Sequence, residues 1–161
     1  MKTPAFKRGD ETHPLDLCLV DIYIYLNNIY LGMDYQHSKN KVYLMNYHLV
    51  WCPKRRKKVL QGAIKNRLEE IIQEVCKEQK VKILTMEVMP DHLHLFVSSH
   101  PDLHIHELIR RIKGRSARYL RKEYPELLKL PSMWTHSYFI STAGNVSSDT
   151  IQRYIAEQKK Q

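Results

Sequence analysis

Hydrophobic and polar residues alternate with two different periods along this chain, and the periods predict its elements. Between residues 62 and 79, apolar residues recur at helical spacing, at Ile64, Leu68, Ile71, Ile72 and Val75. Runs rich in β-branched and aromatic residues predict strands at 41–51 (KVYLMNYHLVW), 81–89, 92–99 and 133–142. The pattern therefore mixes helices with strands.

Two further helices are predicted from their start signals. A long basic helix is expected from Pro101-Asp102 to about Tyr124, with Asp102 as its cap. A last helix follows the turn at 143–145, where Asp149 and Gln152 have the spacing of a capping box. The resulting order, β-α-β-β-α-β plus a helix, predicts an α+β, ferredoxin-like split-βαβ fold. Such a fold has a four-stranded antiparallel sheet with two helices on one face, and it serves many functions.

The first 32 residues differ from the rest of the chain. They show no clear period and no motif, whereas Met33 opens a segment with a clear pattern to the end. We therefore expect an N-terminal extension at 1–32 and one domain at 33–161. The apolar stretch 15–31 contains Asp16, Asp21, Asn27 and Asn28, which are costly in hydrocarbon, so no membrane association is expected.

Charge and cysteine content narrow the class of protein. The chain has 161 residues, and 26 Lys and Arg against 17 Asp and Glu give a net charge of +9. This charge favours a polyanionic partner, first of all nucleic acid, although a basic soluble protein without such a partner has the same composition. The cysteines Cys18, Cys52 and Cys76 form no C-x-x-C pair, which argues against a thiolate zinc site and a disulfide framework. A reducing cytoplasm is the expected compartment.

The most specific local motif is a His-x-His pair in the predicted strand 92–99. Side chains alternate along a strand, so His92 and His94 share one face and Leu93 and Leu95 the other. The two histidine Cα atoms are expected roughly 6.6 Å apart, so both imidazoles can converge on one metal ion. The alternative is a pair of half-exposed histidines that bind nothing.

A second His-x-His pair, His104 and His106, provides a comparison. It falls inside the predicted basic helix, where residues two apart point about 200° away from each other. Its histidines are therefore expected not to share an ion, and no site is assigned to them.

The predicted last helix carries a tyrosine and a glutamine one turn apart. Tyr154 and Gln158 lie on one stripe, so a phenol and an amide oxygen can face the same point. Spacing alone does not distinguish this tyrosine from three others, Tyr119, Tyr124 and Tyr138.

Four segments together resemble a known family. They are YHLVWCPKRRKKVL (47–60), MEVMPDHLHLFV (86–97), IRRIKGRSARYLR (109–121) and MWTHSYFISTAGNVSSDTIQRYIAEQ (133–158). In this order they are similar to the single-tyrosine transposases of the insertion-sequence-200-like group, in the His-hydrophobic-His endonuclease superfamily. The resemblance implies that His92 and His94 bind a metal, that Tyr154 is the nucleophile and that Gln158 is the third protein ligand. None of these positions departs from the family pattern.

The resemblance also implies an activity and an assembly. A catalytic domain at 33–161 would cut and rejoin single-stranded DNA at hairpin-marked element ends through a 5′-phosphotyrosine. Mg²⁺ is the expected cofactor, and Mn²⁺ is expected to substitute for it. No nucleotide is expected, because the sequence lacks a G-x-x-x-x-G-K-[ST] loop. A homodimer is expected, in which the tyrosine helix of one subunit can serve the histidine pair of the other, with 143–145 as the hinge.

Two basic features are candidates for DNA binding. One is the run Lys54, Arg55, Arg56, Lys57 and Lys58; the other is the helical stripe Arg111, Arg115, Arg118 and Lys122. Either could instead be a solvated charged surface.

Three alternative functions stay open at the level of the sequence. A replication-initiator-type nicking enzyme shares the histidine pair and the tyrosine, and a domesticated palindrome-processing relative would share all four segments. A non-catalytic ferredoxin-like nucleic-acid-binding module is the alternative from another class. It would carry aromatic residues for base stacking on the face where this chain has His92 and His94.

Overall fold

The structure, a computed structural model, describes residues 35–143. They belong to one compact unit, Asp34–Gln161. Tyr154, Gln158 and the predicted last helix lie outside the described residues. The elements, in chain order, are β1 (Gln36–Ser38), β2 (Lys41–Tyr43), β3 (Asn46–Trp51), η1 (Lys54–Arg56), α2 (Gly62–Glu78), β4 (Lys82–Met89), β5 (His92–Ser98), α3 (Ile105–Glu123), η2 (Pro125–Lys129) and β6 (Phe139–Ala143).

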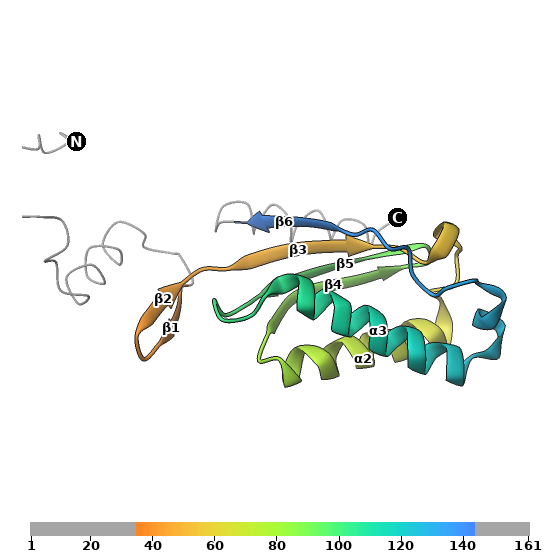
Figure 1. The fold of residues 1–161 in the computed structure, drawn as a ribbon, viewed down its shortest axis with the longest axis horizontal. Coiled ribbons are helices and arrows are strands. Elements are labelled where there is room, and N and C mark those ends of the chain that lie inside the picture. Colours follow the sequence, from red (N-terminus) through yellow and green to blue (C-terminus); the bar gives the residue numbers. More distant parts are fainter. Residues whose placement is uncertain (1–34, 144–161) are drawn as a thin grey trace, which may run out of the picture. The chain divides into compact units, whose positions relative to one another are not determined.

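The main sheet has four strands in the order β4-β5-β3-β6. Each neighbouring pair is antiparallel, and α2 and α3 lie on the same side of the sheet (Figure 1). This is the order of a split-βαβ arrangement, in which each outer strand follows a helix that crosses the sheet. The predicted α+β fold, with a four-stranded antiparallel sheet and two helices, is confirmed.

The core lies between this sheet and the two helices. Helix α2 buries the stripe that its sequence period predicts, including Leu68, Ile71, Ile72 and Val75. From β5, Leu93, Leu95 and Val97 join the same core and are fully buried. Each such side chain contributes about 1.5–3 kcal/mol on removal from water. Because these residues face the helices, the alternate positions of β5 face the other side of the sheet.

The predicted strand 41–51 is divided into two. Residues 41–43 form β2, which pairs with β1 across a turn at Lys39-Asn40, whereas residues 46–51 form β3. Between them, the carbonyl of Met45 accepts a hydrogen bond of 2.9 Å from the backbone N–H of Ser99. The first part of the run therefore belongs to a separate hairpin.

Helix α3 begins at Ile105, later than predicted. Asp102 does not cap it, because its carboxylate pairs with Lys41, and the cap residue is His104, which makes no side-chain cap bond. The prediction for Asp102 is therefore wrong. The angular argument for His104 and His106 is wrong as well, since His104 precedes the helix and the two rings lie 5.8 Å apart.

Strand β6 begins at Phe139 rather than at Met133, because the segment before it is hydrogen-bonded to residues of α3. Trp134 enters the core, where its Nε1–H donates to Ser116 Oγ at 3.0 Å. Lys113 Nζ donates to the carbonyls of Thr135 and His136 at 2.7 and 3.2 Å. These bonds hold the segment against α3, and its backbone bonds to residues just beyond β3, where Thr135 N donates to Cys52 O at 3.1 Å.

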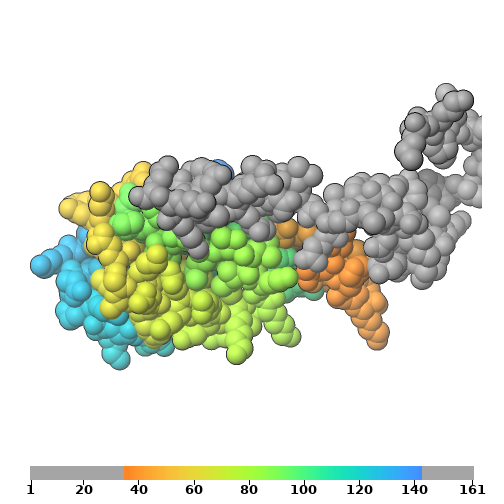
Figure 2. Space-filling view, turned by 180° about the vertical axis from the view of Figure 1, so that it is seen from behind, coloured from red at the N-terminus to blue at the C-terminus, as the bar shows by residue number. Residues whose placement is uncertain are grey.

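Ion pairs join the two helices at their surface. Arg67 of α2 donates to Glu123 of α3 at 2.9 Å, and Arg115 of α3 donates to Glu78 of α2 at 2.6 and 2.7 Å. In Figure 2 the side chains of α2 form much of the visible surface, with the hairpin β1–β2 at one end. Within residues 35–143, no helix combines the length and the apolar character that crossing a membrane requires.

Candidate functional site

Strand β5 brings His92 and His94 together on the face of the sheet opposite the helices. Their ring centroids lie 5.1 Å apart with an interplanar angle of 80°. The side chain of His92 is 22% exposed, whereas His94 is buried at 7% exposure. The convergence expected from strand alternation is therefore present, and His92 is the more exposed of the two rings.

The carboxylate of Asp91 holds the ring of His92. The Nδ1 atom of His92 lies 2.6 Å from Asp91 Oδ1, a charge-assisted hydrogen bond in which the ring N–H donates. This bond is the main reason why the pKa of Asp91 is lowered. Asp91 lies in the turn before β5 and not in the strand, so the alternation of side chains along β5 does not determine where its carboxylate points.

A third histidine, which the sequence did not single out, completes the cluster. Nε2 of His48 on β3 lies 3.0 Å from Nδ1 of His94, and the two rings are nearly parallel, at 12°. The two strands pair so that His48 is opposite Phe96, which lies two residues beyond His94 on the same face of the sheet. Alternation along β3 shows from the sequence which of its residues share a face with His48. The register between β3 and β5, which places His48 beside His94, cannot be derived from a single sequence.

Burial favours the neutral form of His48 and His94. It lowers the pKa of His48. It also lowers the pKa of His94 to about 4, with smaller contributions from the neighbouring His48 and His92. A neutral imidazole has a lone pair on one nitrogen, and this is the form that binds metal ions.

Two of the described residues, His92 and His94, are suited to bind a divalent metal ion. Nδ1 of each ring is hydrogen-bonded, so Nε2 is the atom with which His92 and His94 can bind an ion. Within residues 35–143, no cluster of three or more His, Cys, Asp or Glu side chains could hold an ion. A complete site therefore requires ligands beyond this set, and Gln158, the predicted third ligand, lies outside the described residues.

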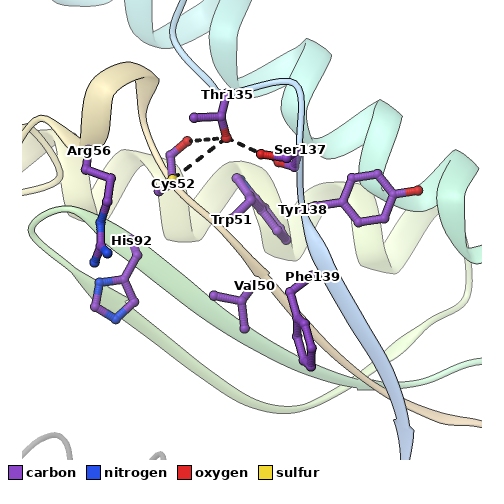
Figure 3. Close-up of a pocket in the computed structure, with 9 residues that line it drawn as sticks. All are labelled: Val50, Trp51, Cys52, Arg56, His92, Thr135, Ser137, Tyr138 and Phe139. Carbon is purple, nitrogen blue, oxygen red and sulfur yellow. Dashed lines mark hydrogen bonds between the residues drawn. The ribbon is translucent and has the colours of Figure 1, made fainter.

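A hollow of about 390 Å³ opens beside His92 (Figure 3). Arg56 of η1 lines it, and its Nη2 donates to Asp91 Oδ2 at 3.0 Å, so one carboxylate links Arg56 to His92. Phe139 and Tyr138 line the other side, and Figure 3 shows the Tyr138 hydroxyl directed away from His92. The hollow thus combines an imidazole with a guanidinium.

The helical stripe predicted to bind DNA lies beside acidic side chains, unlike Arg56 in the hollow beside His92. Arg115 is paired with Glu78 through both of its terminal nitrogens. Together with Arg118 it lines a hollow to which Glu74 and Glu78 also contribute. The stripe is carried by α3, on the side of the sheet opposite the histidines. The structure therefore does not bring it to the histidine pair, whereas it does bring Arg56 there.

Comparison with known proteins identifies the family to which this chain belongs. The sequence pattern of the family described as "Transposase IS200 like" matches residues 41–158. The ISDra2 transposase TnpA of Deinococcus radiodurans is 35% identical over 133 residues, covering 81% of this chain and 95% of that protein. The transposase of insertion sequence element IS200 from Salmonella typhimurium is 27% identical, covering 70% and 75%. The chain belongs to the IS200-like transposase family.

Solved structures agree with this assignment. A candidate transposase from Deinococcus radiodurans R1 superposes with a TM-score of 0.64 and is 29% identical, covering 76% of this chain and 97% of that one. A REP-associated tyrosine transposase bound to a REP hairpin has a TM-score of 0.50 and 16% identity, covering 74% and 68%. The second likeness concerns the fold alone.

Proposed function

We propose that this protein cuts and rejoins single-stranded DNA at hairpin-marked ends of a mobile element, through a covalent bond to Tyr154. Membership of the transposase family implies DNA cleavage and strand transfer. The observation that carries the finer proposal is the convergence of His92 and His94 beside a hollow that holds a guanidinium. This arrangement is suited to a phosphodiester and a metal ion.

The nucleophile in this proposal is the phenol oxygen of Tyr154. It attacks the scissile phosphorus, a bond from the tyrosine oxygen to phosphorus forms, and the bond from phosphorus to the 3′-oxygen breaks. The phenolic proton passes to water, and the 3′-oxygen takes a proton from water and leaves as a hydroxyl. Rejoining is the reverse attack by a 3′-hydroxyl, which releases Tyr154. The energy of the phosphodiester is kept in the covalent intermediate, so the reaction needs no nucleotide.

The histidine cluster would hold the metal that this attack requires. A free phenol has a pKa near 10, so only about one in a thousand is ionised at pH 7. A divalent ion, Mg²⁺ or Mn²⁺, supplies Lewis-acid polarisation of the phosphate when bound. His92 and His94 would bind it through Nε2, and Gln158 is proposed as the third ligand. Asp91 and His48 would fix the two rings through their Nδ1 atoms.

DNA hairpins are the proposed substrates. The REP-associated transposase with the same fold was solved with a REP hairpin, and the net charge of +9 suits a polyanion. The run 54–58 is proposed as part of the DNA-binding surface, since η1 borders the hollow through Arg56. The stripe Arg111, Arg115, Arg118 and Lys122 is proposed as a second, more distant contact.

Incubation with hairpin-bearing single-stranded DNA tests this function. With Mg²⁺ or Mn²⁺ the parent protein should form a DNA–protein adduct that survives a denaturing gel. EDTA should abolish the adduct. Tyr154→Phe should form none while still binding the hairpin, because it lacks only the nucleophilic oxygen. Hairpin binding by the parent protein without any adduct would instead support a non-catalytic module.

A further inference from the structure

Arg56 differs from the other basic residues of the run 54–58. Of these five residues, all within the described part of the chain, Arg56 alone lines the hollow beside His92. Figure 3 shows its side chain extending from η1 towards the ring of His92. The side chain is 66% exposed, so its guanidinium is accessible from solvent. Arg56 is therefore the member of this run that a phosphate beside His92 would meet.

The backbone reaches this position through an uncommon conformation. Arg55 and Arg56 have φ angles of 59° and 49°, in the left-handed region that L-residues other than glycine rarely adopt. The turn is held by hydrogen bonds of 2.9 Å from Arg56 N to Pro53 O and from Lys54 N to Met133 O. Strained backbone of this kind concentrates at functional sites, where the surrounding structure maintains it.

A carboxylate fixes the guanidinium relative to the histidine pair. Asp91 accepts from Arg56 Nη2 through Oδ2 at 3.0 Å, and from His92 Nδ1 through Oδ1 at 2.6 Å. Asp91 thus places a cation and an imidazole at one side of the hollow. A guanidinium has five N–H donors in a planar fork, so it can donate to a phosphate while one nitrogen donates to a carboxylate.

We infer that Arg56 is a catalytic residue whose guanidinium donates to a non-bridging oxygen of the phosphate that is cut. This inference rests on the proposed function. Negative charge on the non-bridging oxygens must be stabilised while the tyrosine–phosphorus bond forms and the bond to the 3′-oxygen breaks. Arg56 transfers no proton in this step. Its role is to stabilise this charge and to orient the phosphate beside His92.

Replacing Arg56 with glycine tests the inference with little risk to the fold. Glycine adopts a φ of 49° without strain, so Arg56→Gly should retain the turn. Lys80→Gly is the matched control. Lys80 is exposed and has a φ of 55°, and it precedes β4, whose far end pairs with His92. The two variants remove the same charge from the same kind of backbone position, one inside the hollow and one far from it.

The single-turnover rate of adduct formation should fall about 100-fold or more in Arg56→Gly, with hairpin affinity within about threefold of the parent. Guanidinium ion at tens of millimolar should raise the rate of Arg56→Gly about tenfold or more, because it can occupy the vacated position. NaCl at equal ionic strength is the comparison. Arg56→Lys should restore little, since an ammonium lacks the fork that contacts Asp91 and a phosphate together. Lys80→Gly should react at the parental rate.

The outcomes separate this inference from the proposed function. A parent protein that forms no adduct would refute the proposed function and the role of Arg56 with it. A parent that forms the adduct, together with an Arg56→Gly variant that reacts equally fast, would overturn the role of Arg56 alone. A slower Arg56→Gly variant that guanidinium does not rescue, and whose loss of rate follows its loss of hairpin affinity, would also overturn it.

Discussion

The imidazoles of His48, His92 and His94 form a chain of ring contacts across two neighbouring strands. His92 is held by Asp91 at 2.6 Å and His94 by His48 at 3.0 Å. If His94 holds a metal through Nε2, as proposed, its Nδ1 would carry the proton and would donate to Nε2 of His48. His48 is therefore proposed as a residue that orients a ligand without touching the metal.

Replacing His48 should weaken metal binding. His48→Phe retains an aromatic ring but cannot accept the hydrogen bond from His94, so the Kd for Mn²⁺ should rise about tenfold or more. The affinity can be measured by following free Mn²⁺ with electron paramagnetic resonance. His106→Phe, which alters an exposed histidine of α3, provides the control and should bind as the parent does. Equal affinity in the parent and in His48→Phe would exclude this role.

Acid should destabilise the metal-free protein through His94. The pKa of His94 is about 4 in the folded chain, against an ordinary value of 6.5. Between these values the unfolded chain binds the proton and the folded chain does not, so the free energy of unfolding decreases as pH falls. The slope from this residue is about 1.4 kcal/mol per pH unit at most. Denaturant unfolding in EDTA at pH 6.5 and 5 should show a smaller decrease for His94→Gln than for the parent.

The sequence predicts the residue-scale site in part. Strand alternation was sufficient to place His92 and His94 together, because it depends only on neighbouring residues. The contact of His48 with His94 depends on the register between β3 and β5, which involves residues distant in the chain. Arg56 and Asp91 meet because η1 and the turn before β5 are packed together, a tertiary arrangement that spacing does not encode.

At the scale of elements, tertiary contacts rather than local sequence patterns determine where β6 and α3 begin. The run 133–142 has strand-forming residues throughout, yet β6 begins at Phe139, because burial of Trp134 and the bonds from Lys113 hold the earlier part against α3. Asp102 is a good capping residue, yet it pairs with Lys41 and α3 begins at Ile105. The core stripe of α2, by contrast, follows from its own period.

The hydrogen bond between Trp134, in the segment before β6, and Ser116 of α3 should contribute to the free energy of unfolding. Ser116 is fully buried and accepts the Nε1–H of Trp134 at 3.0 Å. Ser116→Ala leaves this indole donor without its partner, so the free energy of unfolding should fall by about 1–3 kcal/mol. Urea denaturation measures the change. Ser132→Ala, which removes a part-buried hydroxyl near the same tryptophan, should cost less; an equal or larger cost would contradict the role of Ser116.

At the scale of the whole molecule, the proposed reaction requires Tyr154 to reach the histidine pair of a subunit. We propose a homodimer in which Tyr154 of one subunit serves His92 and His94 of the other, with residues 143–145 as the hinge. A mixed dimer of Tyr154→Phe and His92→Ala subunits tests this arrangement. In trans, one site combines intact histidines with an intact tyrosine, so cleavage should return to about half of the parental level. A mixed dimer that binds the hairpin but does not cleave would exclude the trans arrangement for this step.

The covalent bond to Tyr154 is the central claim, and mass spectrometry of the adduct tests it most directly. The parent protein is incubated with Mn²⁺ and hairpin-bearing single-stranded DNA, then digested with trypsin and nuclease. The account predicts that a nucleotide remnant is attached through its 5′-phosphate to the peptide containing residues 154–159. Attachment to a peptide containing Tyr119, Tyr124 or Tyr138, or the absence of any attached nucleotide, would contradict it.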